Sequence, residues 1–328
     1  MTVRIAILDD YQNLALSLAD WSRVRERAEV VVFDRHLGSI EVAAEALTSF
    51  DVLCTLRERM AVPAELIDAL PNLKAIAITG KHHRTLDMAA ATAHGIPVMA
   101  TGSGADGQYA TAELAWGLII GLLRHIPGES AGMRAGGWQT TLGTCLFGKR
   151  LGLVGLGRLG GRMAMAGNAF GMDVVAWSPN LTEERARDAG ARLVGKDELF
   201  RESDVVSLHI VLSERSRGVV GAADLARMKS SAILVNTSRG PLVDQDALIA
   251  ALRGGRIAGA GIDVFDREPL PADHPLRALP NVLLTPHLGY TVRETFEAFY
   301  RETVANLEAW LAGAPVNVTN PEAFSAGG

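Results

Sequence analysis

The chain has 328 residues, of which 48% are hydrophobic and 21% charged, and its formal net charge is −5. This composition predicts a folded protein of two ordinary domains and excludes a disordered chain. The mildly acidic balance gives no general attraction to nucleic acid or anionic membranes. Two cysteines, Cys54 and Cys145, are too few for a disulfide framework and favour the cytoplasm.

Short apolar strands alternate with helical stretches from the N-terminus onward, which is typical of parallel α/β sheets. The first expected strands are residues 3–8, 29–33, 52–56, 73–79 and 96–99. A helix is expected around Leu14, Leu18 and Trp21, after the first strand. No signal peptide precedes that strand, and the longest apolar stretch, Leu114–Leu123, is shorter than the roughly 18 residues of a membrane span.

A glycine-rich break at 102–107 and a long apolar helix at 110–125 separate this series from a second one. The second series of expected strands is 151–154, 173–177, 205–208, 232–236, 259–263 and 282–285, followed by an amphipathic helix at 294–311. We therefore expect an α/β protein with two Rossmann-like or flavodoxin-like domains, each built on a parallel sheet. A nucleotide-binding domain of residues 102–290 is inserted into an outer, substrate-binding domain of residues 1–101 and 291–328.

A glycine-rich motif follows the first strand of the second series and reads Gly155-Leu156-Gly157-Arg158-Leu159-Gly160. Its spacing, between a strand and a helix, predicts a dinucleotide-binding turn. Glycine is required because the turn is tight and the backbone must approach the pyrophosphate, while the following helix offers free N–H groups to the anion. A tight turn without any ligand is the alternative interpretation.

The next strand ends at Trp177 and is followed by Ser178 and Pro179. This fold normally has a carboxylate here, which binds the adenosine ribose hydroxyls. A serine does not repel a 2′-phosphate as a carboxylate does, and Arg185 on the next helical stretch could pair with one. The sequence is therefore compatible with both NAD and NADP and does not decide between them.

Three further motifs accompany the glycine-rich one in the same order along the chain. They are Val235-Asn236-Thr237-Ser238-Arg239-Gly240, Gly261-Ile262-Asp263-Val264-Phe265-Asp266-Arg267-Glu268-Pro269 and Leu284-Thr285-Pro286-His287. With these motifs the chain resembles the D-isomer-specific 2-hydroxyacid dehydrogenases over nearly its whole length. The resemblance implies a split outer domain, a homodimer formed through the central domain, and catalysis by Arg239, Glu268 and His287.

The chemistry of these three side chains supports that assignment. Reduction of a 2-oxo acid needs a hydride donor, a proton donor for the developing alkoxide, and a cation for the carboxylate. The guanidinium of Arg239 can hold a carboxylate through two hydrogen bonds. His287 is the natural proton donor near neutral pH, and Glu268 would orient its ring and favour the imidazolium. Each residue alone is equally compatible with a structural role.

The resemblance also implies contacts with the nicotinamide cofactor. It places Asp263 on the carboxamide, Thr237 and Gly289 near the nicotinamide ring, and His209 and Val211 in a further contact segment. The family usually has a proline at the position of Val211. The predicted cofactor-binding residues are therefore Gly155, Gly157, Arg158, Leu159, Gly160, Ser178, Pro179, His209, Val211, Thr237, Asp263 and Gly289.

The segment from Thr79 to Asp87 corresponds to the family's glycine-rich substrate loop, whose N–H groups bind the substrate carboxylate. Gly80 and Asp87 fit that pattern, but His82 stands where a second glycine is usual. The segment contains four successive basic or titratable side chains: Lys81, His82, His83 and Arg84. They could recognise a second anionic group on a larger substrate, and a solvated basic turn is the alternative.

The predicted substrate-binding residues are Arg57, Gly80, Lys81, His82 and Arg239. No metal site is expected, because the adjacent histidines 82 and 83 point apart and no third ligand is evident. Trp138, after two glycines, is expected either to line the cleft or to pack at a dimer contact.

The expected function is therefore an NAD- or NADP-dependent D-2-hydroxyacid dehydrogenase acting on a small anionic 2-oxo or 2-hydroxy acid. Glyoxylate and hydroxypyruvate are compatible with the resemblance, and 3-phosphoglycerate would suit the basic segment. A non-catalytic, dinucleotide-sensing binding protein of the same fold is the alternative from another class. Formate oxidation is disfavoured because formate enzymes lack the Glu268–His287 pair.

Overall fold

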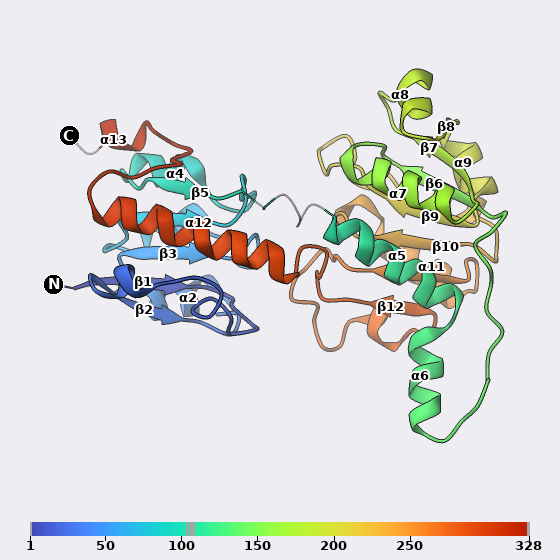
Figure 1. The fold of residues 1–328 in the computed structure, drawn as a ribbon, viewed down its shortest axis with the longest axis horizontal. Helices are drawn as coiled ribbons and strands as arrows, with labels where there is room; N and C mark the ends of the chain where they lie inside the picture. The colour runs from blue at the N-terminus through green and yellow to red at the C-terminus, as the bar shows by residue number, and fades with distance from the viewer. Residues whose placement is uncertain (1, 103, 105–108, 327–328) are drawn as a thin grey trace. The chain divides into compact units, whose positions relative to one another are not determined.

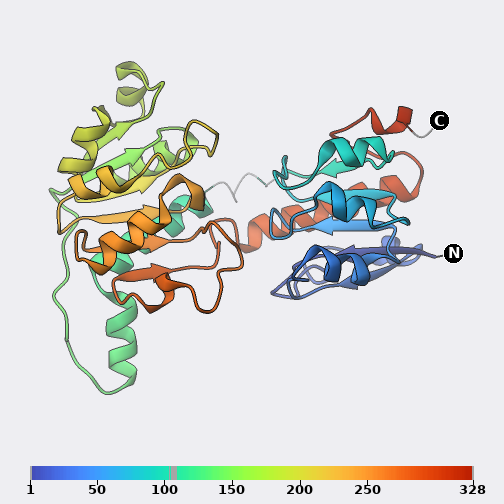
Figure 2. The ribbon, with the colours of Figure 1, turned by 180° about the vertical axis from the view of Figure 1, so that it is seen from behind.

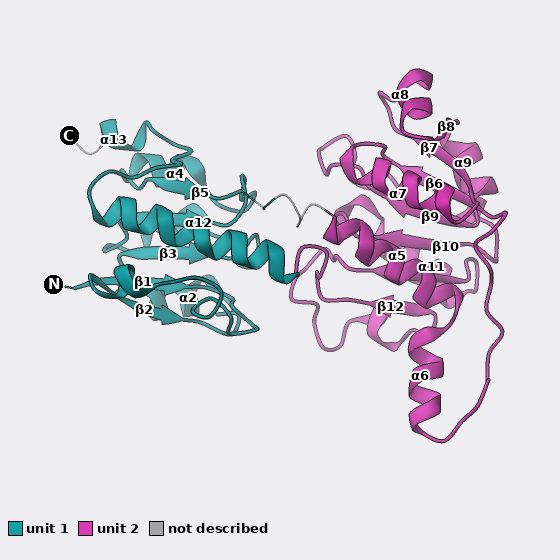
Figure 3. Cartoon of the chain, in the orientation of Figure 1, with its two compact units in different colours: residues 1–108, 292–328 teal, residues 109–291 magenta. Residues whose placement is uncertain are grey.

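The computed structural model describes residues 2–102, 104 and 109–326, and the chain forms two compact units (Figure 3). Unit 1 comprises residues 1–108 and 292–328, and unit 2 comprises residues 109–291. On sequence grounds the boundaries are expected at 101/102 and 290/291. Within the expected glycine-rich break, residues 103 and 105–107 lie outside the described part of the chain.

Within its described residues, unit 1 contains a parallel sheet of five strands in the order β2-β1-β3-β4-β5. Its elements are β1 (Val3–Ile7), α1 (Ser22–Arg25), β2 (Ala28–Val32), α2 (Ile40–Leu47), β3 (Val52–Thr55), α3 (Ala64–Asp68), β4 (Ala75–Ile78), α4 (Met88–Ala93), β5 (Val98–Ala100), α12 (Arg293–Leu311) and α13 (Ala323–Ala326). Helix α12 covers one face, and α2, α3 and α4 cover the other (Figures 1 and 2). This strand order is the flavodoxin-like one.

Unit 2 is described throughout and contains a parallel sheet of seven strands in the order β12-β11-β10-β9-β6-β7-β8. Its elements are α5 (Ala110–Leu123), α6 (Ile126–Arg134), β6 (Arg150–Val154), α7 (Arg158–Ala169), β7 (Asp173–Trp177), α8 (Glu183–Asp188), β8 (Arg192–Leu193), α9 (Lys196–Glu202), β9 (Val205–Leu208), α10 (Ala222–Arg227), β10 (Ile233–Asn236), a 3-10 turn (Gly240–Leu242), α11 (Gln245–Arg253), β11 (Gly259–Ile262), a second 3-10 turn (Pro275–Ala278) and β12 (Val282–Leu284). The order reverses between β6 and β9, as in the Rossmann fold.

Helices cover both faces of each sheet, and the strands are accordingly apolar on both sides. Every residue of β3, β4, β9, β10 and β11 is buried. Each fully buried Val, Ile or Leu side chain contributes about 1.5–3 kcal/mol to folding. The expected α/β class with two parallel-sheet domains is confirmed.

The helix expected around Leu14 and Leu18 is wrong, because residues 11–21 form turns and α1 begins only at Ser22. Side chains satisfy the backbone of this segment instead. The Asp10 carboxylate accepts a hydrogen bond from the Ala15 amide at 2.8 Å, and the Trp21 indole donates to the Ala15 carbonyl at 2.8 Å. The strand β8 and the helix α6 are absent from the sequence expectations.

Helix α5 packs against β10, β11 and α7 as part of the core of unit 2. Helix α6 and the extended segment 135–149 that follows it project from the body of this unit (Figure 1). No helix in the described part of the chain is both long and apolar enough to cross a membrane.

Candidate active site

The three predicted catalytic side chains lie at one edge of the unit 2 sheet. Arg239 follows β10, Glu268 follows β11 and His287 follows β12. These strands are neighbours and run parallel, so their carboxyl ends meet at the same edge. Ligands of doubly wound α/β folds bind at that edge.

His287 and Glu268 form a close ion pair or hydrogen bond. The distance between His287 Nδ1 and Glu268 Oε2 is 2.6 Å, and Glu268 Oε1 accepts a hydrogen bond from the Phe265 amide at 2.8 Å. The side chains are 25% and 30% exposed, respectively. The carboxylate therefore fixes the plane of the imidazole and engages Nδ1, which leaves proton exchange with a substrate to Nε2.

The backbone around His287 is held by a buried carboxylate. His287 has a left-handed φ of 55°, and its amide donates to the Asp263 carbonyl at 2.8 Å. The Asp263 carboxylate accepts hydrogen bonds from the Thr285 hydroxyl at 2.6 Å, the Leu288 amide at 2.7 Å and the Gly289 amide at 2.9 Å. Burial raises the pKa of Asp263, against the opposing effect of these donors. The contact of Asp263 with the carboxamide stays a prediction; its visible role is to hold the loop of residues 285–290, the catalytic loop.

Arg239 is half-buried in a loop that Asn236 shapes. The Asn236 side chain donates to the Arg239 carbonyl at 2.8 Å and accepts from the Ser238 amide at 3.0 Å. The Ser238 hydroxyl donates to the Leu208 carbonyl at 2.6 Å and thereby ties the loop to β9. These bonds fix the backbone from which the guanidinium of Arg239 extends.

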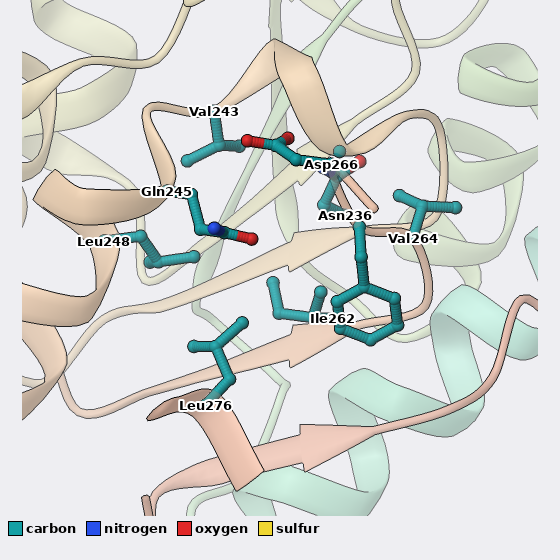
Figure 4. A pocket seen from close by; sticks show the side chains of 10 residues that line it. Asn236, Val243, Gln245, Leu248, Ile262, Val264, Asp266 and Leu276 are labelled. Atoms are coloured by element: carbon teal, nitrogen blue, oxygen red, sulfur yellow. The ribbon is translucent and has the colours of Figure 1, made fainter. Parts of the chain in front are cut away.

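The loops that carry Arg239 and Glu268 pack directly on each other. A side chain at Gly240 would collide with the backbone of Phe265 and Asp266. A small cavity of about 20 Å³ remains beneath the two loops, lined by Asn236, Gly240, Val243, Gln245, Leu248, Ile262, Val264, Phe265, Asp266 and Leu276 (Figure 4). This is room for about one water molecule.

The glycine-rich turn lies at the point where the strand order reverses. Gly155 has φ 98°, and a Cβ there would lie 2.7 Å from the backbone of His209 and Ile210. A Cβ at Gly160 would collide with the Gly155 carbonyl, whereas one at Gly157 meets no atom within 4 Å. Gly155 and Gly160 are therefore required by internal packing, and of the three motif glycines Gly157 alone faces open space.

The surroundings of this turn fit a dinucleotide cofactor. Thr237 Oγ1 and His209 Nδ1 are buried and have no hydrogen-bond partner among the described residues, although buried polar atoms are normally paired. Burial lowers the pKa of His209 to about 4, so its ring is neutral, and its Nε2 lies 2.9 Å from the Ser207 hydroxyl. A polar ligand at this edge of the sheet would supply hydrogen-bond partners to these two atoms. It would also meet the open glycine at the start of α7.

The remaining predicted cofactor residues differ in accessibility. Ser178 is half-buried, whereas Pro179 and Arg158 are exposed, and Val211 is 70% exposed. Arg185, the side chain considered for a 2′-phosphate, is exposed on α8. Within the described residues, no group of three or more His, Cys, Asp or Glu side chains is arranged to hold a metal ion.

In unit 1, Arg57 and Gly80 meet at the carboxyl ends of β3 and β4. Arg57 has φ 56°, its amide donates to the Thr79 hydroxyl at 2.6 Å, and its guanidinium occupies the space that a side chain at Gly80 would need. Gly80 itself has φ 87°, and its amide donates to the Thr101 hydroxyl at 2.8 Å. Asp87 caps helix α4 by accepting from the Ala90 amide at 2.9 Å.

The four successive basic or titratable side chains do not form one cluster. Lys81 and His82 are exposed, but His83 is buried, and burial lowers its pKa to about 4. Arg84 is drawn to Glu58, whose carboxylate accepts a hydrogen bond from the Arg84 amide at 3.2 Å. His83 is therefore not available to bind a second anionic group, while a contact of Lys81 and His82 with substrate stays a prediction.

Two residues beside the catalytic loop are not among those predicted from the sequence. The Tyr290 ring meets the His287 ring edge to face, with 5.3 Å between ring centroids and an interplanar angle of 77°. The Thr111 hydroxyl, from the first turn of α5, donates to the Gly289 carbonyl at 2.6 Å. The short spacing from His287 could have drawn attention to Tyr290, but nothing local connects Thr111 with a loop 178 residues away.

Known proteins resemble this chain in both sequence and structure. Residues 116–289 match the profile of the D-isomer specific 2-hydroxyacid dehydrogenase NAD binding domain. The chain is 31% identical to a hydroxypyruvate reductase of Blautia hydrogenotrophica, covering 97% of this chain and 100% of that protein. It is 36% identical to a glyoxylate reductase of Korarchaeum cryptofilum, covering 92% of each.

Among solved structures, a phosphoglycerate oxidoreductase from Vibrio cholerae is similar, with a TM-score of 0.89 and 36% identity over 95% of this chain and 100% of that one. The chain belongs to the D-isomer specific 2-hydroxyacid dehydrogenase family and is a nicotinamide-dependent oxidoreductase of 2-hydroxy acids.

Proposed function

We propose that this enzyme reduces small 2-oxo acids without a phosphate group, with glyoxylate and hydroxypyruvate as the first candidates. The observation that carries this proposal is the 2.6 Å pairing of His287 with Glu268 at the sheet edge that also carries Arg239. The similar reductases of Blautia and Korarchaeum support the choice of substrates.

In the proposed reaction each side chain has one task. Arg239 binds the substrate carboxylate through its guanidinium. A bound nicotinamide would supply the hydride to the carbonyl carbon. Protonated His287 gives the Nε2 proton to the carbonyl oxygen, and Glu268 holds the ring and stabilises its charged form. In the reverse direction, neutral His287 takes the hydroxyl proton.

The alternative substrate, 3-phosphoglycerate, needs a second anion site. The Vibrio relative described as a phosphoglycerate oxidoreductase is the observation that favours it. In the basic segment, however, His83 is buried and Arg84 is drawn to Glu58. Only Lys81 and His82 are left as exposed side chains that could contact a phosphate. Two exposed side chains offer weak, screened attraction to a phosphate, so the unphosphorylated acids are the preferred substrates.

The experiment that tests this proposal is reduction of a panel of 2-oxo acids, with and without phosphate groups, followed by oxidation of NADH or NADPH. We expect turnover of glyoxylate or hydroxypyruvate, and a fall of roughly 10²–10⁴-fold in His287→Ala, as is usual on loss of a general acid. Cofactor binding without turnover of any acid would instead support the dinucleotide-sensing alternative.

For the cofactor, we propose that NADPH is accepted alongside NADH, because Ser178 replaces the carboxylate that would repel a 2′-phosphate. Ser178→Asp should lower kcat/KM for NADPH while kcat/KM for NADH is retained. An unchanged ratio of the two kcat/KM values would contradict this proposal.

Gly157→Ala should weaken binding of both cofactors without affecting folding, since its Cβ meets no protein atom. Gly161→Ala is the matched control, because that glycine also has open space around it.

We also propose a cytoplasmic homodimer formed through α6 and the segment 135–149. Both cysteines are free thiols, which fits a reducing compartment. The projecting segment exposes large apolar side chains, with Trp138 73%, Leu142 93% and Phe147 77% exposed, and such a patch is typical of an interface. Light scattering should give twice the 34.9 kDa chain mass, and Leu142→Asp should yield monomers; a monomeric wild type would contradict the dimer.

A further inference from the structure

The first turn of α5 contacts two separate parts of the active site of unit 2. Thr111 Oγ1 donates to the Gly289 carbonyl at 2.6 Å. Two residues earlier, the Tyr109 ring lies under the guanidinium of Arg162, at 3.7 Å from the ring centroid. Arg162 belongs to α7, the helix that begins at the glycine-rich turn. One helical turn therefore connects the cofactor helix with the catalytic loop.

Gly289 is held through both of its backbone groups. Its amide donates to Asp263 Oδ2 at 2.9 Å, and its carbonyl accepts from Thr111. A Cβ at this position would lie 3.2 Å from Asp263 Oδ2 and 3.2 Å from Thr111 Cγ2, so the close approach favours glycine. Gly289 is two residues from His287 in the chain, and a shift of its backbone would be transmitted directly to the imidazole.

The loop needs such support because of its conformation. His287 has φ 55°, a left-handed value that is uncommon outside glycine and persists when the surroundings fix it. Asp263 engages the N–H side of this loop through the Leu288 and Gly289 amides. The hydrogen bond from Thr111 acts on the carbonyl side, which Asp263 as an acceptor cannot hold.

We propose that Thr111 is a positioning residue for the reaction. Its hydrogen bond to Gly289 sets where the catalytic loop, and with it the imidazole of His287, stands relative to α7 and the cofactor site. Thr111 touches neither the reacting atoms nor the Glu268 carboxylate and acts through the backbone alone. This inference rests on the proposed proton transfer by His287.

The test compares Thr111→Val, which keeps the shape but removes the donor, with Thr111→Ser, which keeps the donor. In Thr111→Val we expect kcat for glyoxylate to fall roughly tenfold while KM and the NADH dissociation constant stay within about twofold, since only the geometry of proton transfer changes. Thr111→Ser should remain close to wild type, because the hydroxyl restores the bond.

Hydrogen–deuterium exchange of the protein without cofactor gives a second readout. The amides of residues 288–290 should exchange faster in Thr111→Val and at the wild-type rate in Thr111→Ser, while the amides of α7 remain unchanged in both. If the wild type reduces no 2-oxo acid, the proposed function fails, and this exchange pattern still decides whether Thr111 holds the loop.

Two results would overturn the inference. Wild-type kcat together with wild-type exchange in Thr111→Val would show that the hydrogen bond does not set the loop. A loss of activity in Thr111→Ser but not in Thr111→Val, with a matching loss of melting temperature, would show that Thr111 acts by packing of its methyl group.

Discussion

Two loops of this protein carry a histidine after a parallel strand, and their surroundings differ. In the loop 79–87 of unit 1, His83 is 6% exposed, and burial lowers its pKa to about 4. In the catalytic loop of unit 2, the His287 side chain is 25% exposed and lies 2.6 Å from Glu268. The first histidine is held neutral inside the fold, and the second has both a carboxylate partner and access to solvent. A run of titratable residues in the sequence therefore does not identify the histidine that can transfer a proton. A carboxylate partner and access to solvent do identify it.

Each histidine also lies near a glutamate from another loop, and the two contacts differ. Glu58 accepts a hydrogen bond from the Arg84 amide at 3.2 Å and lies near His83, whereas Glu268 contacts the imidazole of His287 directly. The difference predicts which carboxylate matters for turnover and which for the local structure of its loop.

The largest effect is expected for Glu268→Gln, which removes the charge that holds and stabilises the imidazolium. We expect kcat/KM to fall by about 10²-fold, at the lower end of the range for acid–base groups. Glu58→Gln is the matched control and should keep kcat/KM near the wild-type value. The comparison between the loops would break if both variants lost activity equally when assayed on the same 2-oxo acid.

A medium effect is expected on the pH dependence of stability through His83. Its pKa in the folded protein is about 4, below the value near 6.5 of an unfolded chain. As pH falls below 6.5, the unfolded chain binds the proton first, so the free energy of unfolding decreases by about 1.4 kcal/mol per pH unit down to pH 4. Above pH 7 this contribution no longer changes with pH.

Urea unfolding at pH 7.5 and pH 5 measures this effect in wild type and in His83→Gln. The variant should lose less stability on acidification than the wild type does, while the equally buried His209 contributes the same slope in both proteins. Identical losses in the two proteins would mean that His83 does not stay neutral in the folded state.

The smallest effect is expected for Lys81→Ala. This side chain is exposed, and an exposed charge contact contributes about 0.5 kcal/mol, or roughly a twofold change in KM for glyoxylate. A much larger rise in KM that is confined to phosphorylated acids would reinstate the basic segment as a phosphate site. Steady-state kinetics on the two classes of acid make the distinction.

The sequence was sufficient to predict the two parallel sheets and to name three candidate residues that the structure places at one edge of the same sheet. The apolar runs predicted both parallel sheets, because strands covered on both faces must be apolar throughout. The order of the motifs around Arg239, Glu268 and His287 predicted residues that the structure places after three neighbouring strands. Local patterns carry this information, since each motif directly follows a strand.

What failed depends on side-chain contacts and burial that the hydrophobic pattern does not show. The spacing of Leu14 and Leu18 fits a helix, but the Asp10 carboxylate and the Trp21 indole hold that segment in turns. Similarly, the sequence alone predicts His83 as part of a basic cluster, but its side chain is buried in the structure. The contact between Thr111 and Gly289 spans 178 residues and leaves no local pattern.

The most direct test of hydride transfer to a 2-oxo acid with His287 as the acid uses NADH deuterated at nicotinamide C4 on the transferred face. With glyoxylate as substrate, mass spectrometry of the product should show glycolate with one deuterium on C2 in the wild type. In His287→Ala the same product should form at a rate lower by roughly 10²–10⁴-fold. Glycolate without deuterium, or labelled glycolate formed equally fast by the variant, would contradict the account.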